Sequence, residues 1–372
     1  MTPEKHAQWA RQLGAISKQP LACCGNFPEI ARRWEAWWRF KADRPVMTCR
    51  VALRNDIYWG KAFHLLDNYD AWLASQLLQL ENTHWMGDTL PHVRVDIGPE
   101  APAAFLGAPL TISEAEQTAW NTPVIESWTP PPRIQFDPGN KWFRYVVDTL
   151  AKVAADARGR YVVCLPDMGG AMDVLVNMRD PTRLCMDVMD EERDAVKTAA
   201  MQIADAWGPM YQEIVDAVLS RGAGCINQML CWSDFPYVVP TCDFNALIGP
   251  EDFADLCLPS LERQARHAGR VCFHLDGPQA SRHAPALARL PWVTAVQYTP
   301  GAGTPSALAK LDMFCSLQDA GKPVLTAVPA GELEEFCARL DPRGLAIYVG
   351  GISTVAEADE CMKIAEKFRA RG

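Results

Sequence analysis

Val271-Cys272-Phe273-His274-Leu275-Asp276-Gly277-Pro278 reads as a short buried strand that ends in two polar side chains and is followed by a Gly-Pro breaker. Successive side chains of a strand point to opposite sides. The apolar side chains of Val271, Phe273 and Leu275 therefore share one side and would pack against covering helices. The thiol, imidazole and carboxylate of the stretch share the other side, which becomes more polar toward the carboxyl end.

This polar side predicts a functional site. In an α/β barrel, the side chains at the carboxyl ends of the strands face the substrate. A purely structural strand has little reason to gather an imidazole and a carboxylate there. The structural alternative is that His274 and Asp276 form a hydrogen-bonded pair that braces a turn, because paired polar groups also occur in structural networks.

Strand-like and helix-like stretches alternate along the rest of the chain. The strand-like runs cover residues 46–51, 92–97, 161–165, 225–230, 271–276, 293–298, 324–328 and 346–349. The helix candidates cover residues 141–158, 190–221, 250–267, 280–290 and 305–320, and a last helix begins at Thr354. Glu357 stands three residues after Thr354, which is the spacing of a capping box.

The alternation predicts parallel strands joined by helical crossovers. Eight such strands indicate a single α/β (β/α)8 TIM-type barrel over residues 45–372, preceded by an N-terminal helical extension over residues 1–44. A doubly wound open sheet is the alternative, but it would favour a G-x-G-x-x-G fingerprint after an early strand, and none occurs there. Residues 99–138, between the second and third strands, form a long excursion that is either a lid at the barrel mouth or a surface insertion.

The aromatic cluster Trp34-Glu35-Ala36-Trp37-Trp38-Arg39-Phe40 lies in the N-terminal extension. It could serve as an interface or a lid, and the alternative that we favour is a helix that packs across the bottom of the barrel. Asp43-Arg44-Pro45 then ends the helix, because the residue before a proline avoids helical geometry.

The composition limits the kinds of partner. Of the 372 residues, 49% are hydrophobic and 22% charged, which supports a large core and excludes global disorder. The formal net charge is −9, and no basic block with interleaved aromatic residues stands out, so we expect neither a nucleic acid nor an anionic membrane as a partner.

The cysteines and the N-terminus indicate the cellular compartment. The 13 cysteines are scattered, with no C-x-x-C pair, which suits reduced thiols in a core better than a disulfide scaffold. No stretch of the sequence has the pattern of a signal peptide or the length to cross a bilayer. These features together predict a cytoplasmic protein.

Further candidate site residues stand at other predicted strand ends. Asp167, Trp232, Asp234, Gln297 and Tyr298 are expected to bind the substrate or take part in the reaction. Asp167 precedes Met168-Gly169-Gly170, where the backbone can approach a ligand; its structural alternative is a helix cap. We expect Asp167, Trp232, His274 and Gln297 to line one cavity at the carboxyl end of the barrel.

Two motifs resemble the uroporphyrinogen decarboxylase superfamily. They are the run from Cys242-Asp243-Phe244 through Ile248-Gly249-Pro250-Glu251-Asp252-Phe253 to Leu258-Pro259, and the strand that carries His274. The resemblance extends over most of the chain and is strongest over residues 161–353. It implies a (β/α)8 barrel and one of two chemistries, since the superfamily includes the haem-pathway decarboxylase and the cobamide-dependent methyltransferases.

The methyltransferase branch is the more similar of the two. The decarboxylase carries an R-Q-A-G-R-Y segment for substrate carboxylates, whereas this chain has Arg44-Pro45-Val46-Met47-Thr48-Cys49-Arg50 in the matching region. The methyltransferases bind zinc through H-x-C on the fifth strand and a cysteine near the eighth. Here the fifth strand has His274-Leu275-Asp276, and Gly350-Gly351-Ile352-Ser353 holds no cysteine.

The resemblance therefore implies a methyl transfer between a small substrate and a corrinoid (cobalamin) carried by a separate protein. His274 and Asp276 would be ligands of zinc or another divalent metal, since a site with a carboxylate also admits harder ions. A third ligand would come from Cys231, Asp234 or Asp167. The expected partners are the small-molecule substrate and the corrinoid protein, and the expected assembly is a homodimer.

Two other functions stay open. One is a metal-independent decarboxylase or lyase in which Asp167 or Asp276 donates a proton, with a pKa shifted by burial. The other is a non-catalytic barrel that binds a small molecule or a tetrapyrrole, because a fold does not by itself determine function. Metal content, porphyrinogen binding and turnover distinguish the three.

Overall fold

The computed structural model describes residues 2–99, 101–189 and 192–370. Its strands are β1 (Val46–Ala52), β2 (Thr83–Gly87), β3 (His92–Arg94), β4 (Leu110–Ser113), β5 (Thr118–Asn121), β6 (Val162–Cys164), β7 (Cys225–Ile226), β8 (Tyr237–Val238), β9 (Arg270–Asp276), β10 (Ala295–Thr299), β11 (Val324–Pro329) and β12 (Leu345–Gly350). Each of the eight predicted strands is present, although those at 92–97, 161–165 and 225–230 are shorter than expected.

The helices follow the predicted alternation. They are α1 (Pro3–Ile16), α2 (Phe27–Trp38), α3 (Tyr69–Glu81), α4 (Ala101–Phe105), α5 (Lys141–Ala157), α6 (Ala171–Arg179), α7 (Pro181–Met189), α8 (Arg193–Leu219), α9 (Pro250–Asp252), α10 (Leu258–Ala265), α11 (Gly277–Ala280), α12 (Ala284–Arg289), α13 (Leu311–Asp319), α14 (Leu333–Arg339) and α15 (Val355–Lys367). The short 3-10 helices η1 (Phe63–Leu65), η2 (Asp243–Leu247), η4 (Ser281–His283), η5 (Ala307–Lys310), η6 (Ala330–Glu332) and η7 (Pro342–Gly344) and the π-helix η3 (Phe253–Cys257) complete the set.

The sequence analysis predicted where two of the helices start. The predicted capping box of α15 is confirmed, because Thr354 and Glu357 bond each other's backbone N–H groups. Asp190, where we expected α8 to begin, lies outside the described residues.

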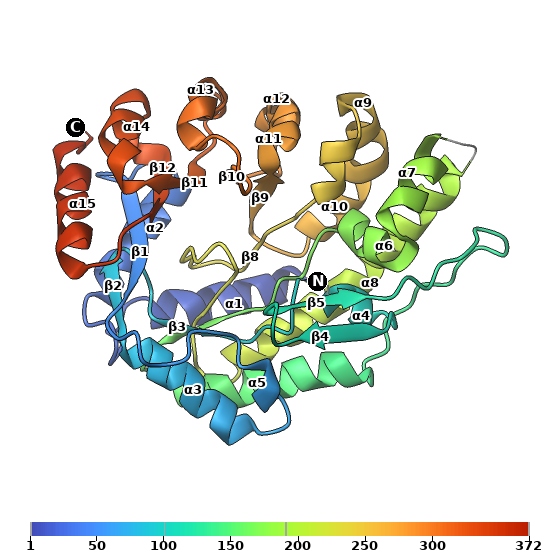
Figure 1. Ribbon diagram of the computed structural model, residues 1–372, viewed down its shortest axis with the longest axis horizontal. Coiled ribbons are helices and arrows are strands. Elements are labelled where there is room, and N and C mark those ends of the chain that lie inside the picture. Colours follow the sequence, from blue (N-terminus) through green and yellow to red (C-terminus); the bar gives the residue numbers. More distant parts are fainter. Residues whose placement is uncertain (1, 100, 190–191, 371–372) are drawn as a thin grey trace.

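The chain is a mixed α/β protein with a central, mostly parallel sheet. One sheet has the order β2-β1-β12-β11-β10-β9-β8, and another has the order β3-β6-β7. All pairs in these sheets are parallel except β1 with β2. Helices α10 to α15 lie along the outer side of β9 to β12 (Figure 1).

The predicted closed ring is interrupted at two places within the described residues. Between β1 and β3, the antiparallel strand β2 pairs with β1, so this edge of β1 does not pair with β3. Between β7 and β8, the chain leaves the sheet after Ile226, and the Asn227 side chain donates a hydrogen bond to the backbone oxygen of Tyr237. Pro236 and Pro240 flank β8 and have no N–H to donate to a ladder, so this part of the sheet pairs poorly.

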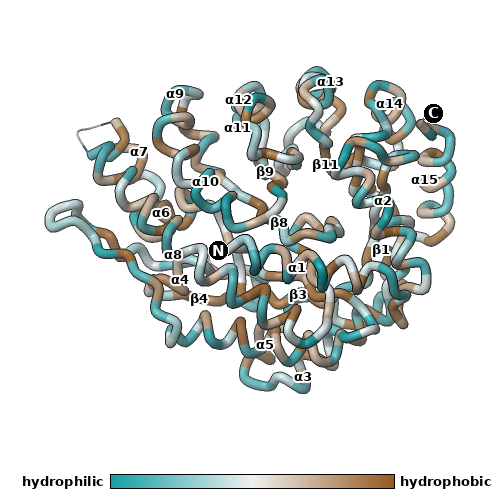
Figure 2. Tube along the Cα trace, turned by 180° about the vertical axis from the view of Figure 1, so that it is seen from behind, coloured by the Kyte–Doolittle hydropathy of each residue, from teal (hydrophilic) through white to brown (hydrophobic). Residues whose placement is uncertain are grey.

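Hydrophobic side chains form two layers. The outer layer joins the helices to Phe273, Leu275 and the equivalent positions of β10 to β12. The inner layer contains small residues of the same strands, such as Cys272 and Ala295, together with the N-terminal helices. Figure 2 shows the trace from behind, with hydrophobic residues along the strands and hydrophilic residues on many outer helix turns.

The N-terminal helices pack at the amino ends of the strands. Trp34 and Trp37 are fully buried, so α2 presents its aromatic residues inward. Buried ion pairs hold the helix there: Arg33 contacts Asp88 at 2.5 Å, and Glu35 contacts Arg270, the first residue of β9, at 2.5 Å. The aromatic cluster of residues 34–40 is therefore packed against the strands, and it is not an interface or a lid.

The excursion over residues 99–138 contains α4 and the antiparallel hairpin of β4 and β5. Its later part packs on α6, where the N–H groups of Val124 and Ile125 both donate to the backbone oxygen of Met178. Arg179 at the end of α6 donates to the oxygens of Ile125 and Glu126. The excursion thus supports the helix that carries Asp173 and Val174 at the cavity described below. In the part of the chain that the structure describes, no helix is long and apolar enough to cross a membrane.

Candidate functional site

Three side chains that could hold a metal ion converge at the carboxyl end of β9. They are Asp243, His274 and Asp276, whose potential ligand atoms all lie within 4.8 Å of one another. His274 and Asp276 are two residues apart on β9, and the alternation of the strand places both on its inner side. Asp243 begins η2, directly after the segment that follows β8.

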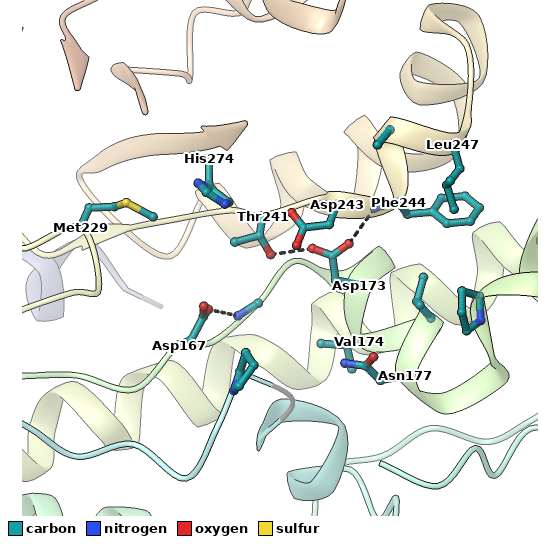
Figure 3. Close-up of a pocket in the computed structure, with 15 residues that line it drawn as sticks. Asp167, Asp173, Val174, Asn177, Met229, Thr241, Asp243, Phe244, Leu247 and His274 are labelled. Atoms are coloured by element: carbon teal, nitrogen blue, oxygen red, sulfur yellow. Dashed lines mark hydrogen bonds between the residues drawn. The ribbon is translucent and has the colours of Figure 1, made fainter. Parts of the chain in front are cut away.

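A cavity of about 420 Å³ opens beside these residues and is lined by Asp167, His274 and residues of α6 and η2. Figure 3 shows Thr241, Asp243 and Asp173 gathered on one side of it, with Asp167 and Met229 nearby. The polar groups come from β9 and from the segments after β6 and β8. The cavity has the size of a small-molecule site with a few convergent polar groups.

Gln297 on β10 determines which nitrogen of His274 is free. The two residues are in register on neighbouring strands, and Nδ1 of His274 bonds to Oε1 of Gln297. The amide nitrogen of Gln297 donates to the hydroxyl of Thr299 at 3.0 Å, which fixes its oxygen toward the imidazole. A carbonyl oxygen only accepts, so Nδ1 carries the proton, and the lone pair of Nε2 is free to bind a metal or accept a proton.

The acids around the cavity bind protons more readily than ordinary carboxyl groups. Partial burial at the mouth, with the carboxylates of Asp276 and Asp167 nearby, raises the pKa of Asp243 to about 6. Burial, with the charge of Asp243, raises the pKa of Asp173 to about 7. A divalent cation would relieve the repulsion that is responsible for part of these shifts.

Hydrogen bonds hold the two deeper acids in place. Asp173 accepts from the hydroxyl of Thr241 at 2.6 Å and from the N–H of Phe244 at 3.2 Å. Asp167 accepts from the N–H of Gly169 at 2.9 Å and from the amide nitrogen of Gln228 at 3.0 Å. Burial nonetheless raises the pKa of Asp167, even though the N–H of Gly169 and the guanidinium of Arg94 favour its charged form.

Of the four residues predicted to line one cavity, Asp167 and His274 do so, Gln297 lies behind His274 without lining it, and Trp232 lies elsewhere together with Asp234. Trp232 is fully buried and its ring lies edge-on to Phe27 of the N-terminal α2 at 4.8 Å. Its indole N–H donates to Asp234 at 2.8 Å, and the N–H of Asp234 donates to Glu35. Glu35 in turn pairs with Arg270 at the start of β9. Arg270 stands four residues before His274, so the two residues are about 13 Å apart along the strand at about 3.3 Å per residue.

The reason for this correction is the path of the chain after β7. Leu230 adopts a positive φ of 56°, and the backbone then returns to the amino end, where Tyr237 pairs with Arg270. Trp232 and Asp234 follow a strand in sequence but do not lie at its carboxyl end. The same turn excludes Asp234 and Cys231 as the third metal ligand that we expected. Asp234 lies at the amino end, and the buried thiol of Cys231 bonds to the backbone oxygen of Met229.

Tyr298 is a further correction. It pairs with Leu275 across the ladder, on the side of β10 opposite Gln297. Its ring is 1% exposed and packs against Phe314 of α13 at 5.9 Å. Tyr298 therefore belongs to the helical layer and cannot reach a substrate in the cavity.

Sequence reasoning missed Asp243 and Asp173 as site residues. Asp243 stands in the motif Cys242-Asp243-Phe244 but follows a strand of only two residues, so no strand pattern marks it as a strand end. Asp173 lies in the first turn of α6, where acidic residues are common for reasons of helix polarity alone. The available signal for Asp243 was its place between a proline-rich segment and the helix start at Pro250.

Comparisons with known proteins show the fold. No family model matches the chain, and no curated protein matches its sequence. Among solved structures, the chain is similar to a methyltransferase from Methanosarcina mazei, with a TM-score of 0.60 and 10% sequence identity over 91% of this chain and 98% of that chain. At this identity the similarity establishes a shared architecture and not a shared activity.

Proposed function

We propose that the protein is a methyltransferase-like enzyme of (β/α)8 barrel architecture, which moves a methyl group between a small substrate and a corrinoid carried by a separate protein. The observation that supports it most directly is the convergence of Asp243, His274 and Asp276 beside a substrate-sized cavity. The similarity to the Methanosarcina mazei methyltransferase over nearly the whole chain supports the architecture. In the barrel reading, β2 and the segment before β8 occupy the two interruptions of the ring.

The donor set fits a divalent metal. One imidazole and two carboxylates are three protein ligands, which is the number that catalytic zinc sites use while keeping a position open for water or substrate. The carboxylates make the set harder than one with thiolates, so ions other than zinc are also accommodated. When bound, such a cation would act as a Lewis acid that lowers the pKa of a substrate thiol and makes it a nucleophile.

The residues of the chain prepare the site for this chemistry. Gln297 accepts from Nδ1 of His274 and so leaves the lone pair of Nε2 free as an acceptor. Asp167, held by Gly169 and Gln228, offers a fixed carboxyl group to the substrate. Asp173 exchanges a proton near neutral pH and lies within a hydrogen bond of Thr241, so it can store a proton that the substrate loses.

Metal analysis tests the proposal. The purified protein should bind about one divalent cation per chain, and Asp243→Ala, His274→Ala and Asp276→Ala should each lose it, because two remaining ligands hold an ion poorly. Asp319→Asn, at an exposed position of α13, serves as the matched control and should keep the metal. Methyl transfer from methylcobalamin to a panel of thiols should fall with the metal content of each variant. Full activity after thorough chelation, or no binding at saturating zinc, would reject the proposal.

A metal-independent lyase is the second candidate function. The pKa of Asp173, raised to about 7, favours it, because a carboxyl group that is protonated near neutral pH can donate a proton to a carbanion. Burial also raises the pKa of Asp167. In that case decarboxylation of a small acid would survive chelation and would be lost in Asp167→Asn or Asp173→Asn. The metal-ligand variants would then affect activity much less than these two.

A further inference from the structure

A second cavity lies at the end of the central sheet formed by β1 and β2, several strands away from β9. Its volume is about 310 Å³, and residues of β1, β2, β3, β12 and α3 line it. Figure 1 shows where these elements lie in the fold. The methyl-transfer proposal makes no use of this cavity. The residues that matter to its chemistry are two arginines, a histidine and three aromatic residues: Arg50, Arg94, His92, Trp59, Trp85 and Tyr348.

The cavity has an excess of positive charge. Arg50 is exposed at its wall, and among the residues that the structure describes no carboxylate lies within ion-pair distance of it. Arg94 pairs with Asp96 at 3.2 Å, but Asp96 is shared with Lys61 at 3.4 Å. The buried Nε of Arg94 has no hydrogen-bond partner among the described residues. The wall of the cavity thus carries the guanidinium groups of Arg50 and Arg94 and, among the described residues that line it, no carboxylate, so an anion in the cavity would balance them.

His92 does not change the charge of the cavity. It is 8% exposed, and its Nδ1–H donates to the backbone oxygen of Leu90 at 2.8 Å. Burial, together with the guanidinium groups of Arg50 and Arg94, lowers the pKa of His92 to about 3, so its ring stays neutral. His92 contributes a flat wall, and the edge of its ring lies against Trp85 at 5.3 Å.

The aromatic walls present ring surface to the cavity. The indole N–H of Trp85 donates to the backbone oxygen of Leu80 at 3.2 Å, and the indole N–H of Trp59 donates to the backbone oxygen of Arg54 at 3.0 Å. Both indoles therefore meet a ligand through their apolar surfaces. Tyr348 on β12 adds a third ring from the neighbouring strand.

The loop that carries Trp59 is held in place. The side chain of Gln79 on α3 donates to the oxygen of Gly60 at 2.8 Å, and the N–H of Lys61 donates to Gln117 of the excursion at 2.7 Å. A wall that is already ordered loses little conformational entropy when a ligand binds.

We propose that this second cavity binds a small aromatic carboxylate. The planar fork of a guanidinium matches a carboxylate through paired, charge-assisted hydrogen bonds, and two such groups converge here. The indole and phenol rings match a flat π-system by offset or edge-to-face packing. A volume of about 310 Å³ is near the lower limit for ligand pockets, which suits one ring with one or two substituents. The proposal stands independently of the methyl-transfer reaction.

Calorimetric titration with benzoate tests the proposal, with tryptophan fluorescence as a second readout because Trp59 and Trp85 line the site. Benzoate should bind saturably with one site per chain and should change the fluorescence. Benzamide, which keeps the ring and loses the charge, and cyclohexanecarboxylate, which keeps the charge and loses the aromatic ring, should each bind more weakly. The absence of saturable benzoate binding would overturn the proposal, and so would equal affinity for either analogue.

Variants locate the site. Arg50→Gln should weaken benzoate binding about tenfold or more, the equivalent of losing a charge-assisted hydrogen bond, and it leaves the packing intact because Arg50 is exposed. Arg94→Gln and Trp59→Leu should weaken binding as well. Arg32→Gln, at an exposed arginine of α2, is the matched control for net charge. A loss in Arg32→Gln equal to that in Arg50→Gln would show a non-specific charge effect and overturn the assignment.

Discussion

The side-chain oxygen of Gln297 accepts a hydrogen bond from Nδ1 of His274 on the neighbouring strand, and this bond leaves the lone pair of Nε2 free in the residue that forms a potential ligand group with Asp243 and Asp276. Groups that orient a metal-binding histidine in this way typically contribute 10- to 100-fold to metal affinity. The bond joins residues that are adjacent in the sheet but separated by a whole helical crossover in the sequence.

Gln297→Met should lower metal affinity by about 10- to 100-fold, because His274 could then place its proton on either nitrogen. Gln297→Glu retains an acceptor oxygen and should restore most of the affinity. Competition with a chromophoric chelator measures both. Gln279→Met, at an exposed position close to the site, should bind metal like the unaltered protein. Equal affinity in Gln297→Met would show that the hydrogen bond does not select the tautomer.

Asp243→Asn should lower the pKa of Asp173, since the charge of Asp243 is one of the causes that raise it to about 7, after burial. The expected direction is toward the ordinary value of 3.8, without reaching it, because burial remains. NMR titration of labelled aspartate carboxyl carbons measures the shift. Asp319→Asn should leave the titration of Asp173 where it was. An unchanged curve in Asp243→Asn would mean that the two acids do not interact.

Asp88→Ala should destabilise the protein by about 3–5 kcal/mol, the usual consequence of removing one partner of a buried ion pair. Asp88 is fully buried and accepts from Arg33 at 2.5 Å, from Arg44 at 2.8 Å and from the N–H of Met47 at 3.0 Å. It thereby joins α2 to the start of β1. Asp56→Ala, which removes an exposed pair with Arg54, should cost far less, because water screens the attraction. Urea unfolding gives both values, and similar losses would contradict the assignment of Asp88 as a structural centre.

His92 should make stability depend on pH in a defined window. Its pKa is about 3 in the folded protein and 6.5 ordinarily, so the unfolded chain binds more protons between these values. The stability that this neutral histidine contributes is complete above about pH 6.5 and is lost as the pH falls toward about 3. His92→Gln should therefore show a flatter dependence of unfolding free energy on pH.

Urea unfolding of His92→Gln and of the unaltered protein between about pH 7 and about pH 4 tests this prediction. His267, whose pKa burial lowers to about 4, is present in both proteins and cancels from the difference. Parallel curves for the two proteins would show that His92 is already able to take up a proton in the folded state.

Local patterns of the sequence determined the strands, the long helices and the orientation of β9. The apolar and polar alternation of residues 271–276 was sufficient to place His274 and Asp276 on the same side of a strand, because the two-residue period of a strand does not depend on its neighbours. The capping box at Thr354 and Glu357 is equally local, since both bonds form within one helical turn.

The tertiary structure alone decided which strand ends meet. Asp243 joins His274 and Asp276 because β8 pairs with β9, and a two-residue strand leaves no pattern in the sequence. Trp232 and Asp234 were expected at the site because they follow β7, but the turn at Leu230 returns them to the amino end, where the pairing of Glu35 with Arg270 holds them. Arg50 and Arg94 come to share a cavity only because β2 opens the ring between β1 and β3. The sequence encodes the direction of each side chain on its own element, whereas long-range pairing, chain reversals and buried charges decide which elements lie side by side.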